Sequence, residues 1–118
     1  MHELVRALKA LSDETRLRIL NLLLERECCV CEVMQALDIS QSRASRNLSI
    51  LYEAGFLKLH RDGLWALYSI DKEAMEEYST YLVKAVSKAL KDDEMARHDH
   101  ERLQSARRMG PGCERDRQ

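Results

Sequence analysis

The chain has few aromatic residues, few glycines, a single proline and no long apolar run. Aromatic residues make up 5% of it, with four Gly and one Pro, which favours a mostly helical chain with few tight turns. The longest stretch without a charged residue is 63–70, far short of the ~18 residues that a bilayer span requires. The N-terminal residues also lack the apolar core of a signal peptide. We therefore expect a cytoplasmic protein with no membrane partner.

Signatures of catalysis are missing as well. No histidine lies close to the cysteines in sequence, and neither a glycine-rich phosphate loop nor a pair of catalytic carboxylates can be recognised. A small helical domain with few aromatic residues leaves little room for a substrate cleft. We expect a protein that is not an enzyme.

The composition fits one folded domain, and its charge is unevenly distributed. In 118 residues, 45% are hydrophobic and 33% charged, with a formal net charge of −1, which permits one modest core. Residues 41–62 carry four basic and two acidic side chains, a net of +2, whereas residues 71–94 carry four and seven, a net of −3. A local basic region can attract a polyanion even when the whole chain is nearly neutral.

Apolar periodicity predicts a series of short helices. Residues 3–11 carry one apolar stripe, and a second helix that ends near Glu25 is apolar on most sides. Ser12 or Asp13 can cap the start of this second helix. A short helix around residues 28–37, a turn at 38–40 and a helix over 41–54 form the pattern of a helix-turn-helix, with Ser40 as N-cap and Gly55 as the C-terminal stop.

The second helix of this pair has a polar face suited to DNA. Short donors and acceptors and two arginines occupy it, with no acid before Glu53. Such side chains can approach base edges in the major groove and phosphates beside it. The predicted DNA-binding residues of this helix are Gln41, Ser42, Arg43, Ser45, Arg46 and Ser49.

Two period-two segments follow, residues 57–61 and 64–70, around a predicted Asp62-Gly63 turn. A hairpin directly after the recognition helix is a wing, and Arg61 near its tip is predicted to reach a phosphate. The expected fold class is therefore mainly α with a β-hairpin wing, a winged helix-turn-helix.

An apolar stripe continues beyond the wing. From about 71 to 90 the helical pattern returns, and we expect this helix to pack with the first helix and a symmetry mate, so that the protein is a homodimer through its terminal helices. Residues 1–90 then form the DNA-binding and dimerisation domain. Residues 91–118 are expected to be a charged tail, frayed or disordered.

Three sequence segments resemble the arsenical-resistance repressors of the ArsR/SmtB family. They are residues 11–20 (LSDETRLRIL), 29–33 (CVCEV) and 40–48 (SQSRASRNL), in the same order and at similar separations. The resemblance implies a dimeric winged-helix repressor of double-stranded operator DNA that is released by a metal or metalloid inducer. It also implies that Cys29 and Cys31 bind trivalent arsenic or antimony, without an organic cofactor.

The chemistry of these cysteines supports a soft ligand. Thiolates prefer soft ions, and a helix N-terminus lowers the pKa of a thiol. Side chains at i and i+2 of a regular helix point about 200° apart. We therefore expect Cys29 and Cys31 to ionise readily, and the helix start to unwind when one ion binds both sulfurs.

The third ligand and one alternative mechanism remain open. Related arsenic sensors often carry a third cysteine where this chain has Met34, so Cys28 and Cys113 are the candidates for a third thiolate. The zinc-type site of the family is not expected, because residues 71–90 contain no histidine, and His98 and His100 are expected to be tail residues. The alternative is a thiol redox or persulfide switch in which Cys113 resolves Cys28 or Cys29.

Overall fold

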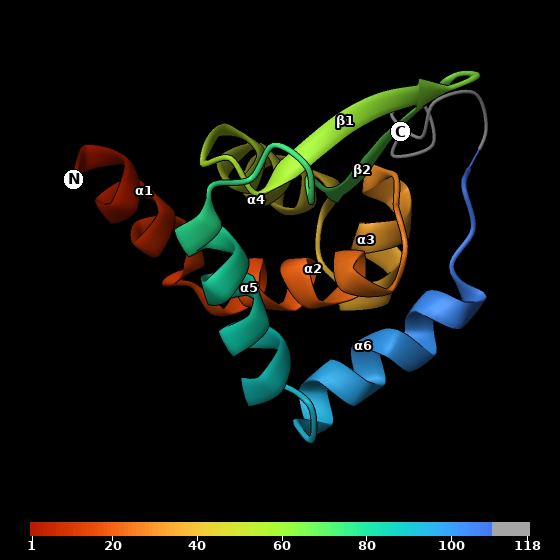
Figure 1. The fold of residues 1–118 in the computed structure, drawn as a ribbon. Helices are drawn as coiled ribbons and strands as arrows, with labels where there is room; N and C mark the ends of the chain where they lie inside the picture. The colour runs from red at the N-terminus through yellow and green to blue at the C-terminus, as the bar shows by residue number, and fades with distance from the viewer. Residues whose placement is uncertain (110–118) are drawn as a thin grey trace.

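A computed structural model describes residues 1–109. The elements in chain order are α1 (His2–Leu11), α2 (Glu14–Glu25), α3 (Val30–Leu37), α4 (Gln41–Glu53), β1 (Leu57–Asp62), β2 (Trp65–Ile70), α5 (Glu77–Ala89) and α6 (Glu94–Ser105). The antiparallel hairpin β1–β2 lies across the α3–α4 pair, and α1 projects from the body of the domain (Figure 1). The predicted helices and wing are thus present in the predicted order.

The local signals at the helix ends act as the sequence suggests. Asp13 caps α2 by accepting a hydrogen bond from the backbone N–H of Arg16, at 3.0 Å. Ser40 caps α4 in the same way, accepting from the N–H of Arg43 at 3.2 Å. Gly55, at φ +93°, ends the helix in a backbone conformation that glycine adopts without strain. These caps fix where the two helices of the helix-turn-helix begin and end.

The core lies where α2, α3, α4 and the hairpin meet. Its largest fully buried side chains include Ile19, Leu20, Leu48, Leu51 and Phe56. Burying a large apolar side chain contributes roughly 1.5–3 kcal/mol, so these groups hold the recognition helix α4 firmly against α2. The core therefore sets the position of the DNA-facing side of α4.

The hairpin turn differs from the prediction by one residue. Asp62 pairs with Trp65, so the two turn residues are Gly63 and Leu64 rather than Asp62 and Gly63. Gly63 lies at φ +64°, and this left-handed conformation suits the first position of a two-residue hairpin turn. Arg61 stays on the wing, exposed, directly before the tip.

The helix after the wing is shorter than predicted, and part of its apolar face packs against the core. It begins at Glu77 rather than near Asp71. Side chains of its expected dimer stripe pack against the main core while remaining partly exposed; they are Met75, Tyr78, Leu82 and Val86. The stripe is therefore shared between the core and an outer face, where Tyr81 is 63% exposed.

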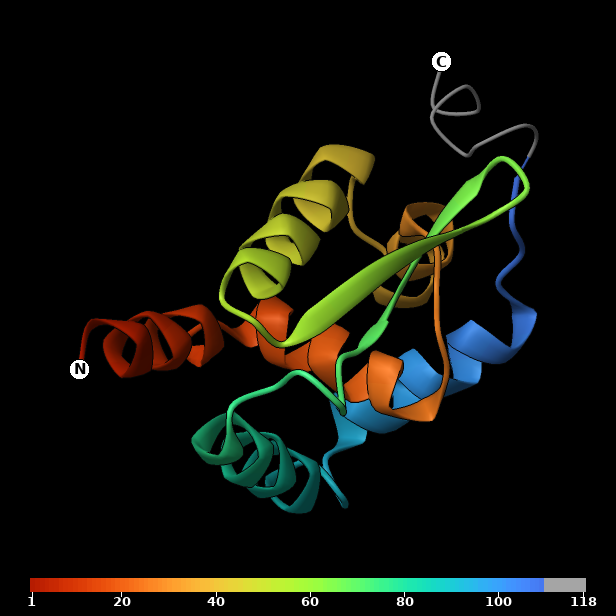
Figure 2. The same cartoon turned by 45° about the horizontal axis from the view of Figure 1, so that its top comes forward.

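The prediction of a frayed tail from residue 91 onward is wrong for the part that the structure describes. Residues Glu94–Ser105 form α6, capped by Asp93, whose side chain accepts from the N–H of Ala96 at 3.0 Å. Figure 2 shows α6 passing below α3, and the chain after it running up to the hairpin. The helix buries Ala96, Asp99 and Leu103. Residues 110–118 lie outside the described residues.

A buried ion pair attaches α6 to the domain. The carboxylate of Asp99 is fully buried and accepts two hydrogen bonds from Arg18 of α2, at 2.8 and 2.9 Å. Arg102 donates to the same carboxylate at 2.9 Å and to the carbonyl of Ala36 at 2.6 Å. The arginines thereby also satisfy carbonyls at the end of α3. None of the helices within residues 1–109 is long and apolar enough to cross a bilayer.

Candidate thiolate site and nucleic-acid interface

The recognition helix α4 presents most of its predicted DNA-binding side chains to solvent. Ser42, Arg43, Arg46 and Ser49 are exposed and Ser45 is half-buried, whereas Gln41 is buried. One of the two arginines also forms a hydrogen bond to a side chain of α2.

That arginine is Arg43, whose guanidinium donates to the hydroxyl of Thr15 at 2.9 Å. Thr15 lies in the first turn of α2 and is itself buried. Arg43 therefore contributes to the packing of α4 on α2, and Arg46 is the arginine whose side chain is fully available to a ligand on this face.

The two predicted ligand cysteines lie together at the start of α3. Cys29 is the N-cap residue, in an extended conformation at φ −87° and ψ 170°, and α3 begins at Val30. The Sγ atoms of Cys29 and Cys31 are 2.9 Å apart. Because Cys29 precedes the helix, the expected 200° divergence does not arise, and the helix start need not unwind to bring the sulfurs together.

The pair sits in a small apolar cluster beneath the wing. Cys29, Cys31 and Leu67 are buried together, with Met34, Trp65 and Met109 packed around them. Met34, which takes the place of a third cysteine, is thus beside the pair as a packing group. The wing strand β2 supplies Leu67 and Trp65, so the two cysteines contact the wing directly.

Cys28 points away from this pair. Its side chain belongs to the main core, and its backbone forms an antiparallel bridge with Tyr68 of β2, with N···O distances of 3.0 and 2.8 Å. Successive side chains of extended backbone point to opposite sides, which separates Cys28 from Cys29. The structure therefore does not bring Cys28 to the candidate site, and Cys113 lies outside the described residues.

The acidity of the thiols differs from the expectation. Burial raises the pKa of Cys29 to about 11, although hydrogen bonds from the backbone N–H of Glu32 and Cys31 oppose the shift. Burial likewise raises the pKa of Cys28 to about 12. The helix N-terminus does act on Cys29, but loss of hydration outweighs it. Both thiols are therefore protonated at neutral pH.

A charged network surrounds the start of α3. The buried carboxylate of Glu32 accepts from the backbone N–H of Cys29 at 2.9 Å, while the Cys29 thiol accepts from the N–H of Glu32, forming a capping box. Arg26 donates to Glu32 at 2.9 Å. Arg108, which follows α6, lies 3.7 Å from Glu32 and donates to Asp62 of the wing at 3.0 Å.

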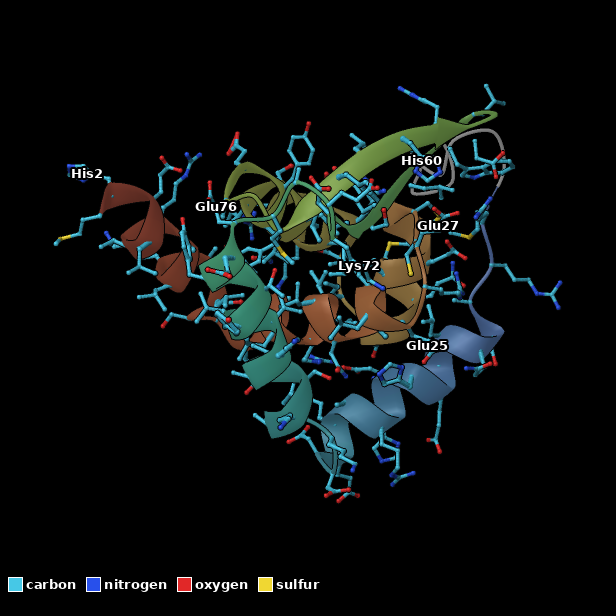
Figure 3. All side chains as sticks on the ribbon, in the orientation of Figure 1. His2, Glu25, Glu27, His60, Lys72 and Glu76 are labelled. Carbon is cyan, nitrogen blue, oxygen red and sulfur yellow. The ribbon has the colours of Figure 1, made fainter. Side chains whose placement is uncertain are left out.

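A second contact joins the wing to the segment that precedes the cysteines. His60 of β1 and Glu27 lie side by side where the α2–α3 connection passes the hairpin (Figure 3), with Nε2 and Oε1 3.3 Å apart. No local motif predicts the His60–Glu27 contact or the contacts of Arg108 with Glu32 and Asp62, because these contacts join segments that are far apart in the chain. Within residues 1–109, no group of three or more His, Cys, Asp or Glu side chains is arranged to hold a metal ion.

These features define a winged helix-turn-helix transcription regulator with two buried cysteines, Cys29 and Cys31, at the junction of its wing and its helix-turn-helix. The family model described as bacterial regulatory protein, arsR family, matches residues 13–58. The chain is 40% identical over 70 residues to an uncharacterized HTH-type transcriptional regulator of Methanocaldococcus jannaschii, covering 58% of this chain and 79% of that protein. The chain belongs to the arsR family.

A named repressor and a solved structure are also similar. The arsenical resistance operon repressor of Escherichia coli is 45% identical over 67 residues, which cover 56% of this chain and 57% of the repressor. The chain thus matches little more than half the length of that relative. The homodimeric winged helix-turn-helix domain of Mb0332 from Mycobacterium bovis superimposes with a TM-score of 0.64 at 28% identity, covering 79% of this chain and 82% of that one.

Proposed function

We propose that this protein is a homodimeric repressor of operator DNA that is released when trivalent arsenic or antimony binds Cys29 and Cys31. The observation that carries the proposal is the pair of Sγ atoms 2.9 Å apart at the N-cap of α3, the first helix of the helix-turn-helix. Two adjacent sulfurs are a suitable donor set for a soft, thiophilic ion. The name of the Escherichia coli relative, arsenical resistance operon repressor, supports arsenic as the bound ion.

The high pKa of Cys29 favours a metalloid hydroxide over a divalent cation. A divalent cation must expel a proton from each protonated thiol, which lowers its affinity at neutral pH. In the reaction with As(OH)₃, each S–H proton instead leaves with a hydroxide as one water molecule, and one S–As bond replaces one As–O bond. This exchange releases no net proton, so the buried Cys29 thiol can still bind arsenite although burial raises its pKa to about 11.

Cys113 is the proposed third ligand. The backbone N–H of Met109 donates to the Sγ of Cys31 at 3.5 Å, and Cys113 follows Met109 by four residues. Four residues of chain span at most about 14 Å, so the covalent chain keeps this thiol within reach of the pair. Cys28 is disfavoured as a ligand, because its side chain lies in the main core.

The DNA interface is proposed from α4 and the wing. Arg46, Ser42 and Ser49 are exposed on α4, and Arg61 is exposed next to the wing tip. A recognition helix in a major groove, flanked by a wing that contacts phosphates, uses polar and basic side chains of this kind for base readout and positioning. Two copies in a dimer would present two of these surfaces to successive grooves.

The dimer is proposed to form through α1 and α5. Leu4, Val5 and Leu8 of α1 are 39–46% exposed, and Tyr81 of α5 is 63% exposed. Large apolar side chains exposed together on one helix commonly mark an association surface. The homodimeric state of the Mycobacterium bovis domain supports a homodimer here.

The test uses an operator duplex that is selected from a random library by its binding to the protein. Arsenite is titrated into the protein–duplex complex in the presence of a phosphine reductant, and fluorescence anisotropy of the labelled duplex reports its release. We expect arsenite to release the wild-type protein. Cys29→Ser and Cys31→Ser should bind the duplex as tightly but stay bound at the arsenite concentration that releases the wild type. Cys28→Ser is the matched control and should remain inducible.

Two other results would contradict the proposal in different ways. If arsenite leaves the wild-type complex intact while peroxide without arsenite dissociates it, the protein is a thiol redox switch. If Cys29→Ser is released as readily as the wild type, this residue is not a ligand. Cys113→Ser separately tests the third ligand, with an expected loss of arsenite affinity but not of operator affinity.

A further inference from the structure

The chain that leaves α6 runs along α3 as a short strap, residues 106–109. Gln35 of α3 holds it through two hydrogen bonds, donating to the carbonyl of Arg107 at 2.7 Å and accepting from the N–H of Arg107 at 3.1 Å. Met109 then contacts the Sγ of Cys31. The strap therefore lies directly on α3, whose N-cap residue is Cys29 and which contains Cys31.

The same strap also contacts the wing. Besides its 3.0 Å hydrogen bond to Asp62, Arg108 places its guanidinium 5.9 Å from the centre of the Trp65 ring, within the range of a cation–π contact. The indole N–H of Trp65 donates to the carbonyl of Met109 at 3.3 Å. Both strands of the hairpin are thus attached to the strap close to the wing tip.

Arg108 is the point where these contacts meet the thiol pair. Its Nε lies 3.7 Å from Oε1 of Glu32, the oxygen that accepts from the N–H of Cys29. The Cys29 sulfur in turn accepts from the N–H of Glu32. A continuous chain of contacts therefore runs from the Cys29 sulfur through Glu32 and Arg108 to Asp62.

We propose that Arg108 is the positioning residue that couples occupancy of the Cys29–Cys31 pair to the wing. The two Sγ atoms are only 2.9 Å apart, so an ion that binds both at about 2.3 Å must push them apart, and this displacement moves the Cys29 sulfur away from the N–H of Glu32. The capping box then weakens, the Glu32 carboxylate shifts, and Arg108 loses the partner that holds it over the wing. The wing, and Arg61 with it, is no longer held in the orientation that suits DNA.

This inference rests on the proposed function, and it assigns the coupling between arsenite binding and DNA release to the contacts of Arg108 with Glu32 and Asp62. Coupling between two sites is a free energy that can change while each site still binds its own ligand. Removing Arg108 should therefore leave the arsenite affinity of the DNA-free protein close to wild type, but should weaken operator binding without arsenite toward the level of the arsenite-bound wild type, because the wing loses the contact with Arg108 in both cases. What should fall is the factor by which arsenite weakens operator binding.

Trp65 provides a readout of the thiol site that does not depend on DNA. It is the single tryptophan of the chain and packs against the Cys29–Cys31 cluster. The arsenite concentration at the midpoint of its fluorescence change measures occupancy in each variant. Operator affinity with and without saturating arsenite gives the coupling factor for the same protein.

The variants are Arg108→Gln and, as the matched control, Arg107→Gln. Both remove one positive charge, but the exposed Arg107 meets α3 through its backbone N–H and carbonyl. We expect Arg108→Gln to reduce the coupling factor about tenfold, within the usual range of such couplings, and Arg107→Gln to leave it unchanged. Asp62→Asn should reproduce the effect, and the double variant Asp62→Asn with Arg108→Gln should lose no more than either alone.

Three results would overturn the inference. If Arg108→Gln is released from the operator as fully as the wild type at equal Trp65 occupancy, Arg108 carries no coupling. If its Trp65 midpoint shifts by the same factor as its release, Arg108 belongs to the binding site rather than to a connection. If the wild-type protein itself shows an arsenite-dependent Trp65 change without operator release, the proposed function fails before any variant is compared.

Discussion

The guanidinium of Arg16 donates to the side-chain carbonyl of Asn47 at 2.9 Å, joining the first turn of α2 to the recognition helix α4. The same guanidinium donates to the carbonyls of Ala10 and Lys9, at 2.6 and 3.3 Å, at the end of α1. Asn47 is buried and donates to the carbonyl of Arg43. One side chain therefore ties the proposed dimer helix α1 to the proposed DNA-reading helix α4.

Arg16→Ala is expected to lower both the free energy of unfolding and the affinity for the operator. Hydrogen bonds from a charged donor contribute about 1.5–3 kcal/mol each, and the change leaves the buried Asn47 carbonyl without this donor. We predict a loss of about 2–3 kcal/mol in the free energy of unfolding, measured by urea denaturation. Arg16→Lys keeps the charge but cannot reach three acceptors at once, so it should be intermediate. Wild-type stability in Arg16→Ala would contradict this role.

Arg46→Ala should lower operator affinity without altering stability. Arg46 is exposed on the proposed reading face, and a good arginine–base pair contributes roughly 1–3 kcal/mol of discrimination. The matched control is Arg97→Ala on α6, where Arg97 pairs with Glu94 and Glu101 of its own helix. Affinity is measured by anisotropy at several salt concentrations. Equal effects of the two variants would show that only total charge matters.

The sequence predicted the winged helix-turn-helix because its signals are local. Ser40, Asp13 and Gly55 lie at helix ends where capping depends on a few neighbouring residues. The turn was misplaced by one residue because Asp-Gly is itself a strong turn signal, whereas the register pairs Asp62 with Trp65. Local patterns fix the element type more firmly than its boundary.

The features that sequence reasoning missed depend on distant contacts. The buried face of α6 has only two apolar residues, Ala96 and Leu103, and the charged Asp99 lies between them. The hydrophobic pattern of this segment therefore resembles that of a solvated tail. Asp99 is buried only because Arg18, 81 residues earlier, pairs with it. The raised pKa of Cys29 likewise follows from burial under the wing, which no local motif encodes. The paired sulfurs were expected, but their position before the helix start was not.

Asp99→Asn should destabilise the domain strongly. Removing one partner of a buried ion pair costs about 3–5 kcal/mol when the other charge stays buried without compensation, as Arg18 does here with a side chain only 15% exposed. Here the change affects both Arg18 and Arg102. The matched control is Glu101→Gln on the same helix, whose exposed pair with Arg97 is expected to contribute less than about 1 kcal/mol. Urea denaturation of the two variants gives the comparison, and similar unfolding midpoints would refute the structural role of Asp99.

Stability is expected to fall at alkaline pH because of the buried thiols. The pKa values of Cys29 and Cys28 are raised from 9.0 to about 11 and about 12 in the folded protein. The folded state therefore holds protons that the unfolded state has lost. The stabilisation is complete below pH 9 and is lost as the pH rises toward 11 and 12, by up to about 1.4 kcal/mol per pH unit for each thiol.

Cys28→Ala isolates the contribution of one thiol to this decline. The variant lacks the group with the higher pKa, so its free energy of unfolding should fall less steeply than that of the wild type between pH 9 and 11, by about 1.4 kcal/mol per unit. Urea denaturation at each pH, under a phosphine reductant, gives the two slopes, and all other titrating groups cancel in their difference. Parallel slopes would mean that the Cys28 thiol ionises equally easily in the folded and unfolded chains, contrary to its burial in the core.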